Sequence, residues 1–269
     1  MTYDALLVAV GARPDVAVPG ALTFFGARSV ESFSELLADL VARRTHRVAF
    51  ALPAGVAWAL PLYELALMTA EHLHDAGVDD AELVLVTPER DPLDVFGAPI
   101  ASRIRALLAQ RDITIRTDTV PFRVGRGGLL VSDGERIAVE RVVSLPRLGG
   151  PWLAGLPHDQ QGFIPTDEHG AVPGAADVWA AGDGTTFAIK QGGIAARQAD
   201  AAAAAIASHL GANVEPVPFK PELRGLLLDP RAARFLHRET GQTSEAALWW
   251  PPSKIAAEYL APYLTAGAE

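Results

Sequence analysis

Short apolar segments alternate with segments of helical length through the first 119 residues of the chain. The short segments are DALLVAV at 4–10, RVAFAL at 47–52, ELVLVT at 82–87 and ITIRTDT at 113–119. The first three of these segments are largely apolar, as expected of parallel strands buried on both faces. The helical segments between them are SVESFSELLADLVARR, PLYELALMTAEHLHDAG and APIASRIRALLAQRD. Because parallel neighbours need crossover connections, this alternation predicts an α/β fold with doubly wound, Rossmann-like parallel sheets.

The hydrophobic period changes between about 120 and 145. The segment FRVGRGGLLVSDGERIAVERVVSL alternates apolar and polar residues and contains Asp133-Gly134, which is a hairpin signal. We expect three short antiparallel strands there. Further on, GGIAARQADAAAAAIASHL predicts a long helix that ends before Gly211, and the prolines that follow it mark a linker into an irregular tail.

Composition and charge exclude several functions. A net charge of −9 argues against a nucleic-acid partner, because phosphate binding needs clustered Lys and Arg. The sequence has no cysteine, which excludes disulfides, zinc–thiolate sites, iron–sulfur ligation and a cysteine redox relay. The seven histidines show no metal-binding spacing, so no metal is expected. Since no apolar run reaches the ~20 residues of a membrane span and no signal peptide is evident, we expect a cytoplasmic protein or one bound only to a membrane face.

Two glycine turns carry the strongest functional signal. YDALLVAVGARP and ADVWAAGDGTTF are each an apolar strand that ends at a glycine, Gly11 and Gly182, and the second continues with Asp183. One interpretation is a turn that holds a polar ligand. The plainer interpretation is that Asp183 caps the turn and the glycines permit it.

Taken in order, these turns, the α/β segment between them and the C-terminal WWPPSKIAAEYLAPYL resemble the FAD-dependent pyridine nucleotide-disulfide oxidoreductase family. The similarity is greatest to its sulfide:quinone reductase and type II NADH dehydrogenase branch. The resemblance implies a two-dinucleotide flavoprotein with a partial FAD-binding-type lobe at 1–30 and 146–212. It also implies an inserted NAD-type Rossmann-like lobe at 31–145 and a C-terminal tail or interface segment at 213–269.

The resemblance also implies roles for particular residues. Asp183 is expected to accept a hydrogen bond from a ribityl hydroxyl of FAD, with Gly182 and Gly184 letting the backbone approach it. The helix that begins near Gly192 is expected to aim its positive end at the pyrimidine edge of the flavin. The expected cofactor-binding residues are Gly11, Gly182, Asp183, Gly184, Lys190, Gln191, Gly192 and Gly193. No residue is a convincing general acid or base, so the catalytic residues are unknown.

Three departures from the family pattern limit this expectation. The N-terminal G-x-G-x-x-G strand–helix fingerprint for FAD is lacking, so the FAD lobe is incomplete and tight FAD binding is expected to need an N-terminal FAD-domain segment or a second chain. In the inserted lobe Ala57, Ala59 and Leu62 stand where glycines belong. Glu89 is a candidate ribose ligand, and both NAD(P)H binding and no nucleotide binding stay open for this lobe. Without cysteine, disulfide reductase and persulfide chemistry are excluded.

The resulting functional hypothesis is the C-terminal portion of an FAD-dependent oxidoreductase. It would pass electrons from a reduced pyridine nucleotide or another donor to a quinone or small acceptor, without redox cysteines. The alternative is a non-catalytic, degenerate Rossmann-type binding or assembly module. Expected partners are a small-molecule redox substrate and no nucleic acid or membrane span. Trp249 and Trp250 are interpreted either as core packing or as an interface, for example of a homodimer.

Overall fold

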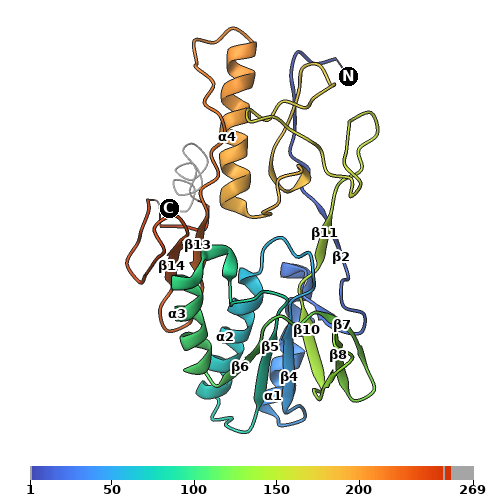
Figure 1. Cartoon of the computed structure of the whole chain (residues 1–269), viewed down its shortest axis with the longest axis vertical. Coiled ribbons are helices and arrows are strands. Elements are labelled where there is room, and N and C mark those ends of the chain that lie inside the picture. Colours follow the sequence, from blue (N-terminus) through green and yellow to red (C-terminus); the bar gives the residue numbers. More distant parts are fainter. Residues whose placement is uncertain (1, 251, 256–269) are drawn as a thin grey trace. The chain divides into compact units, whose positions relative to one another are not determined.

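The computed structural model describes residues 2–250 and 252–255, and the chain divides into two compact units (Figure 1). Unit 1 takes in the chain up to residue 13, residues 148–224 and the described residues from 247 onward. Unit 2 takes in residues 14–147 and 225–246. The chain leaves unit 1 through β2 (Arg13–Asp15) and returns to it through β11 (Arg147–Gly149).

Unit 2 is built on a five-stranded parallel sheet in the order β3-β10-β4-β5-β6. These strands are β3 (Leu22–Thr23), β4 (Arg47–Ala51), β5 (Glu82–Val86), β6 (Ile113–Arg116) and β10 (Arg141–Ser144). The connecting helices are α1 (Val30–Val41), α2 (Leu60–Asp75) and α3 (Ala98–Ala109), with short 3-10 turns η1 (Gly26–Ser29) and η2 (Asp94–Phe96). The strand–helix alternation seen in the sequence is therefore confirmed as a Rossmann-like parallel sheet.

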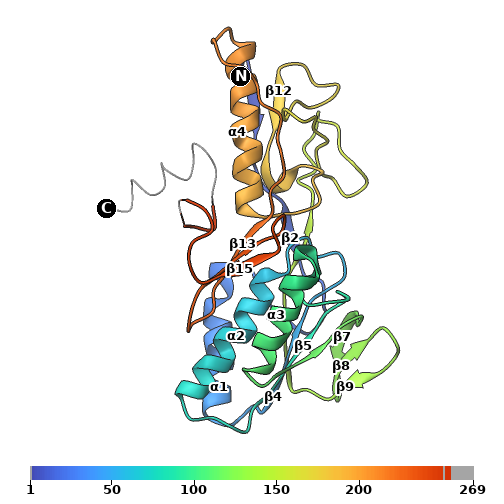
Figure 2. The ribbon, with the colours of Figure 1, turned by 60° about the vertical axis from the view of Figure 1, so that its left-hand side comes forward.

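The two faces of this sheet are covered differently. The helices α1, α2 and α3 pack on one face, and a three-stranded antiparallel sheet packs on the other (Figures 1 and 2). This smaller sheet consists of β7 (Pro121–Gly125), β8 (Gly128–Val131) and β9 (Arg136–Ile137), which confirms the three antiparallel strands expected from the sequence.

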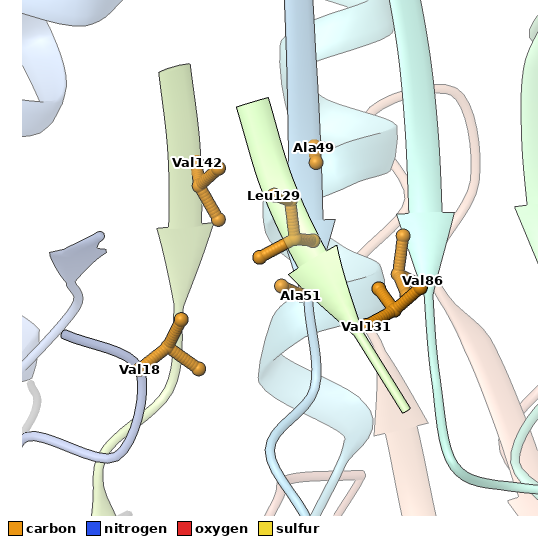
Figure 3. Packing of buried hydrophobic residues seen from close by; sticks show 7 residues of the cluster. All are labelled: Val18, Ala49, Ala51, Val86, Leu129, Val131 and Val142. Carbon is orange, nitrogen blue, oxygen red and sulfur yellow. The ribbon is translucent and has the colours of Figure 1, made fainter. Parts of the chain in front are cut away.

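The core between the two sheets uses small side chains on β4. In Figure 3, Leu129 of β8 lies over β4 near Ala51, and Val131 of β8 lies beside Val86 of β5. The alanines leave room for the larger β8 side chains, and the alternate β4 residues, such as Phe50, are equally buried. The remaining members of this buried cluster are Val18, Val86 and Val142. Burial on both faces of the sheet explains why both faces of β4 are apolar.

The segment expected to be an irregular tail instead contains a three-stranded sheet, so that expectation was wrong. The strands are β13 (Arg224–Leu227), β14 (Arg234–His237) and β15 (Gln242–Ser244), in the order β13-β14-β15. Within unit 2, Asp229 is buried and receives a 2.8 Å hydrogen bond from Arg111 Nη2 at the end of α3. The sheet is fixed by such long-range contacts, and its strands of three or four residues are too short to give a clear local signal.

Unit 1 has a smaller ordered frame. Its parallel strands are β1 (Leu6–Val8) and β12 (Val178–Ala180), and within the described residues this sheet has only these two strands. The Gly-Asp turn forms the 3-10 turn η3 (Gly182–Gly184), and α4 (Gly192–His209) follows. A buried cluster holds this frame together and consists of Val8, Ile164, Val172, Val178 and Ala180. The two strands and the long helix predicted here from the sequence are confirmed.

Candidate functional site

The two predicted glycine turns meet in unit 1. Gly182 has a φ of +82°, a left-handed conformation that glycine adopts without strain. A Cβ on Gly184 would lie 2.9 Å from the carbonyl oxygen of Gly11, closer than a side chain can approach. The structure therefore brings Gly11, Gly182 and Gly184 together, and the absent side chain of Gly184 permits the contact between the two turns.

The Gly-Asp turn is fixed to α4 by a residue that the sequence analysis missed. Gln198 is 7 % exposed, and its Oε1 accepts a hydrogen bond of 2.8 Å from the backbone N–H of Gly182. Its Nε2 lies 3.4 Å from Thr185 Oγ1, and that hydroxyl donates to the Gly182 carbonyl over 3.0 Å. The signal in the sequence was a glutamine seven residues after Gln191, on the same helical face in an alanine-rich segment.

Asp183 carries a buried oxygen that receives no hydrogen bond from the described residues. Its Oδ1 is buried and accepts no hydrogen bond from the part of the chain that the structure describes. Burial raises the pKa of this carboxyl group, and the positive charge of Lys190 acts in the opposite direction. Leaving a buried acceptor unsatisfied costs about 1–3 kcal/mol, and more for a charged group. An external hydroxyl donor would satisfy this oxygen, which fits the ribityl contact that the resemblance implies.

Lys190 is buried and interacts electrostatically with Asp183. The side chain is 8 % exposed, and its Nζ donates a 2.5 Å hydrogen bond to the Thr185 carbonyl oxygen. The ammonium group also lies 4.0 Å from the ring centroid of Phe163, within cation–π range. Burial lowers the pKa of Lys190 to about 8, against the pull of the Asp183 and Asp159 carboxylates. This pKa lies above 7, so the ammonium group is mostly charged at neutral pH and its charge acts on Asp183.

The amino end of α4 is capped from within the chain. Gln191 Oε1 accepts a 2.9 Å hydrogen bond from the Ile194 N–H, and Gln191 Nε2 donates to the Arg224 carbonyl over 3.0 Å. A Cβ on Gly192 would lie 3.4 Å from Cγ1 of Ile255, and one on Gly193 would lie 3.1 Å from Gln191 Oε1. The two glycines therefore let Gln191 and the C-terminal segment approach the first turn of the helix. Their expected role near a flavin ring stays a prediction.

The tryptophan pair divides between two environments. Trp249 is buried, its Nε1 donates to the Ser253 carbonyl over 3.0 Å, and the Arg224 guanidinium lies 5.6 Å from its ring centroid. Trp250 is 84 % exposed. Packing accounts for Trp249, and the interface interpretation stays a prediction for Trp250. Pro251 and the remainder of the C-terminal resemblance, from residue 256 onward, lie outside the described residues.

In unit 2 the candidate ribose ligand, Glu89, already accepts hydrogen bonds from neighbouring side chains. Glu89 Oε2 accepts hydrogen bonds from the hydroxyl of Tyr63 at 2.5 Å and from Oγ1 of Thr87 at 2.8 Å. Burial raises the pKa of Glu89, and these two hydroxyls act in the opposite direction. Burial, and then the charge of Glu89, raise the pKa of Tyr63. Tyr63 was not identified from the sequence because a tyrosine in the first turn of an apolar helix is indistinguishable from ordinary core.

The described part of the chain has neither a metal-binding cluster nor a helix suited to cross a membrane. Among its residues, no three His, Asp or Glu side chains gather where they could hold a metal ion. No helix in the same residues has the length and apolar content that crossing a membrane requires.

The parallel sheet of unit 2 and the clamped Gly-Asp turn of unit 1 define a Rossmann-like α/β protein of the flavoprotein type. Residues 1–208 match the family described as pyridine nucleotide-disulphide oxidoreductase, and the chain belongs to that family. The resemblance found in the motifs is therefore confirmed. The family comprises FAD- and NAD(P)-dependent oxidoreductases, including quinone and ferredoxin reductases.

Solved structures share the fold at low sequence identity. The sulfide:quinone oxidoreductase from the hyperthermophilic bacterium Aquifex aeolicus has a TM-score of 0.78 and 17 % identity, over 87 % of this chain and 61 % of that one. An NAD-dependent persulfide reductase from A. fulgidus has a TM-score of 0.60 and 18 % identity, over 87 % and 44 %. The ferredoxin reductase of the CYP199A2 system from Rhodopseudomonas palustris has a TM-score of 0.63 and 17 % identity, over 87 % and 58 %. The chain thus spans less than two thirds of each of these proteins. A search of curated proteins gave no match.

Proposed function

We propose that this chain is the C-terminal portion of an FAD-dependent oxidoreductase. It would pass electrons from a reduced pyridine nucleotide or another donor to a quinone or small acceptor. The observation that carries the proposal is the buried Oδ1 of Asp183, which no described residue of the chain satisfies. Family membership supports FAD as the group whose hydroxyl fills this position.

The chain's own residues would bind and orient the flavin, which supplies the electron-transfer chemistry when bound. Asp183 would accept a hydrogen bond from the sugar-alcohol chain. Lys190 would favour the ionised form of Asp183, because its ammonium group opposes the effect of burial on the pKa of that carboxyl group. Gln191, Gly192 and Gly193 would lie nearer the ring, at the positive end of α4.

The open edge of β1 supports a requirement for a further FAD-domain segment. Among the described residues β1 pairs only with β12, and Leu7 on β1 is 38 % exposed. Parallel sheets are normally larger and covered on both faces, so a two-stranded one is marginal by itself. We propose that an N-terminal FAD-domain segment, or a second chain that supplies it, pairs with β1 and completes the site.

Flavin titration tests this proposal. The chain is titrated with FAD, alone and together with an expressed G-x-G-x-x-G strand–helix segment, and flavin fluorescence quenching is followed. We expect saturable binding, weakened roughly 10-fold or more by Asp183→Ala, which corresponds to about 1.4 kcal/mol. The exposed Asp4→Ala serves as the matched control and should bind like the wild type. Absence of flavin binding in both formats would overturn the proposal and favour the non-catalytic module.

A further inference from the structure

We infer that unit 2 is closed to nicotinamide dinucleotides, because its own side chains occupy the place where such a ligand binds in a Rossmann-like sheet. The electron donor of the oxidoreductase would then dock outside this lobe. The second statement rests on the proposed function, whereas the closure of unit 2 does not.

The expected position of a dinucleotide follows from the fold. In Rossmann-like sheets the pyrophosphate lies at the amino end of the helix after the first strand, and the adenosine ribose lies beside the loop after the second strand. In unit 2 these are the amino end of α2, reached through residues 52–59, and the loop 87–96 after β5. A bound dinucleotide needs space between these two segments.

An aromatic contact joins the two segments. Trp58, just before α2, packs edge-to-face on Phe96, with ring centroids 5.7 Å apart and an interplanar angle of 62°. Phe96 is 1 % exposed. Its ring is held from another side by Gly225, where a Cβ would lie 2.7 Å from Phe96 Cζ. Three segments of unit 2 therefore meet at this ring.

A polar contact joins the same segments a few residues away. The fully buried Tyr63 donates from its hydroxyl to Glu89 Oε2 over 2.5 Å, and the same hydroxyl accepts from the N–H of Leu93 over 3.3 Å. Leu93 has a φ of +54°, a strained conformation for a leucine, and is 1 % exposed. Thr87 supplies the second donor to Oε2. One oxygen, Oε2, of the carboxylate that would bind ribose hydroxyls is therefore used to tie the loop to α2.

The amino end of α2 is also a poor anion site. Pro61 has no N–H, and the N–H of Leu62 donates to the Ala59 carbonyl over 3.0 Å. Leu62 is fully buried, at the position where a fingerprint glycine would allow the helix to approach the strand closely. The amino end of α2 therefore offers fewer free backbone N–H donors, and the side chain of Leu62 takes up space between the helix and the sheet. Both effects oppose pyrophosphate binding.

Calorimetric titration with NADH and NADPH tests the closure directly. We expect no saturable binding up to about 1 mM, the upper end of usual KM values. If binding is seen, Ala57→Asp, which places a carboxylate in the loop before α2, shows whether unit 2 is the site. The exposed Ala27→Asp is its control, and thermal melts verify that both variants fold. Binding that Ala57→Asp weakens 10-fold or more while Ala27→Asp does not would overturn the inference. Binding that neither variant changes lies outside this site and supports it.

A second measurement addresses the donor. Protein loaded with FAD is kept anaerobic, and its absorbance near the flavin maximum is followed on adding NADH and then dithionite. We expect bleaching with dithionite and none with NADH. Bleaching by NADH that Ala57→Asp suppresses would overturn the inference. Failure to load FAD at all would count against the proposed function, while the titration above still decides whether unit 2 is closed.

Discussion

The side-chain oxygen of Gln198 accepts a hydrogen bond from the backbone N–H of Gly182, although 16 residues separate the two in the chain. The second turn of α4 thereby sets the geometry of the Gly-Asp turn. Because Asp183 lies inside this turn, the direction of its carboxylate depends on a helix residue that is not itself proposed to touch the flavin. Replacing Gln198 should therefore lower the stability of the chain and weaken flavin binding together.

Gln198→Leu should destabilise the chain by about 1–3 kcal/mol, because it leaves the Gly182 N–H buried without its acceptor. Urea unfolding followed by circular dichroism measures this change. The exposed Gln160→Leu is the matched control and should change stability by less than about 0.5 kcal/mol. Equal urea midpoints for Gln198→Leu and the wild type would show that the hydrogen bond between Gly182 and Gln198 does not contribute to stability.

Gly184→Ala should destabilise unit 1, because its Cβ would lie 2.9 Å from the Gly11 carbonyl oxygen. Forcing an extra methyl group into a packed site typically costs about 1–3 kcal/mol. Gly149→Ala is a suitable comparison, since nothing lies within 4 Å of a Cβ there. Thermal denaturation should rank Gly184→Ala clearly below Gly149→Ala, and the reverse order would contradict the contact between the two turns.

Lys190 should make stability rise with pH in the alkaline range. Its pKa falls from 10.5 to about 8 on folding, so the folded state holds its proton less firmly than the unfolded state. The stability that folding gains from the lowered pKa of Lys190 is fully present above pH 10.5 and is lost as the pH falls through 8. The unfolding free energy of the wild type relative to Lys190→Met should therefore increase between these values, by on the order of 3 kcal/mol. Lys220→Met, at an exposed position, should show no such trend when unfolded by urea at each pH.

Tyr63→Phe should remove one of the two hydroxyl donors to Glu89 and destabilise unit 2 by about 1–3 kcal/mol. The pKa of Glu89 is already raised by burial, so its contribution to stability is lost as the pH rises through that raised value. Without Tyr63 the pKa rises further. The loss of stability relative to the wild type should therefore grow as the pH rises through the raised pKa of Glu89 and beyond it. Tyr3→Phe, at an exposed position, is the control, and a pH-independent deficit would contradict the role given to Tyr63.

Much of the fold could be predicted from local patterns. The buried runs at β4 and β5 are apolar on both faces, and Asp133-Gly134 lies in the turn between β8 and β9. Pro61 near the start of α2 and Gly77 just after its end delimit that helix, as their backbone preferences require. These features are encoded within a few residues of where they act.

The parts that escaped prediction depend on contacts between distant residues. The sheet β13–β14–β15 is held by partners such as Arg111 and Asp229, 118 residues apart, and its strands lack a clear period of their own. Gln198 and Tyr63 are each one of several polar residues in their helices, and only the folded chain shows what they bind. The Gly-Asp turn itself could be found from the sequence, whereas the residues that orient it could not.

The outer edge of β1 has a practical consequence for anyone who purifies this chain. A strand with ladder groups facing outward and an apolar side chain at Leu7 is a template for pairing between molecules. The apparent molecular mass of the purified protein should accordingly increase with its concentration, because exposed β1 edges pair nonspecifically between molecules. A proline at position 7, which removes an amide hydrogen from that edge, should keep the material monodisperse.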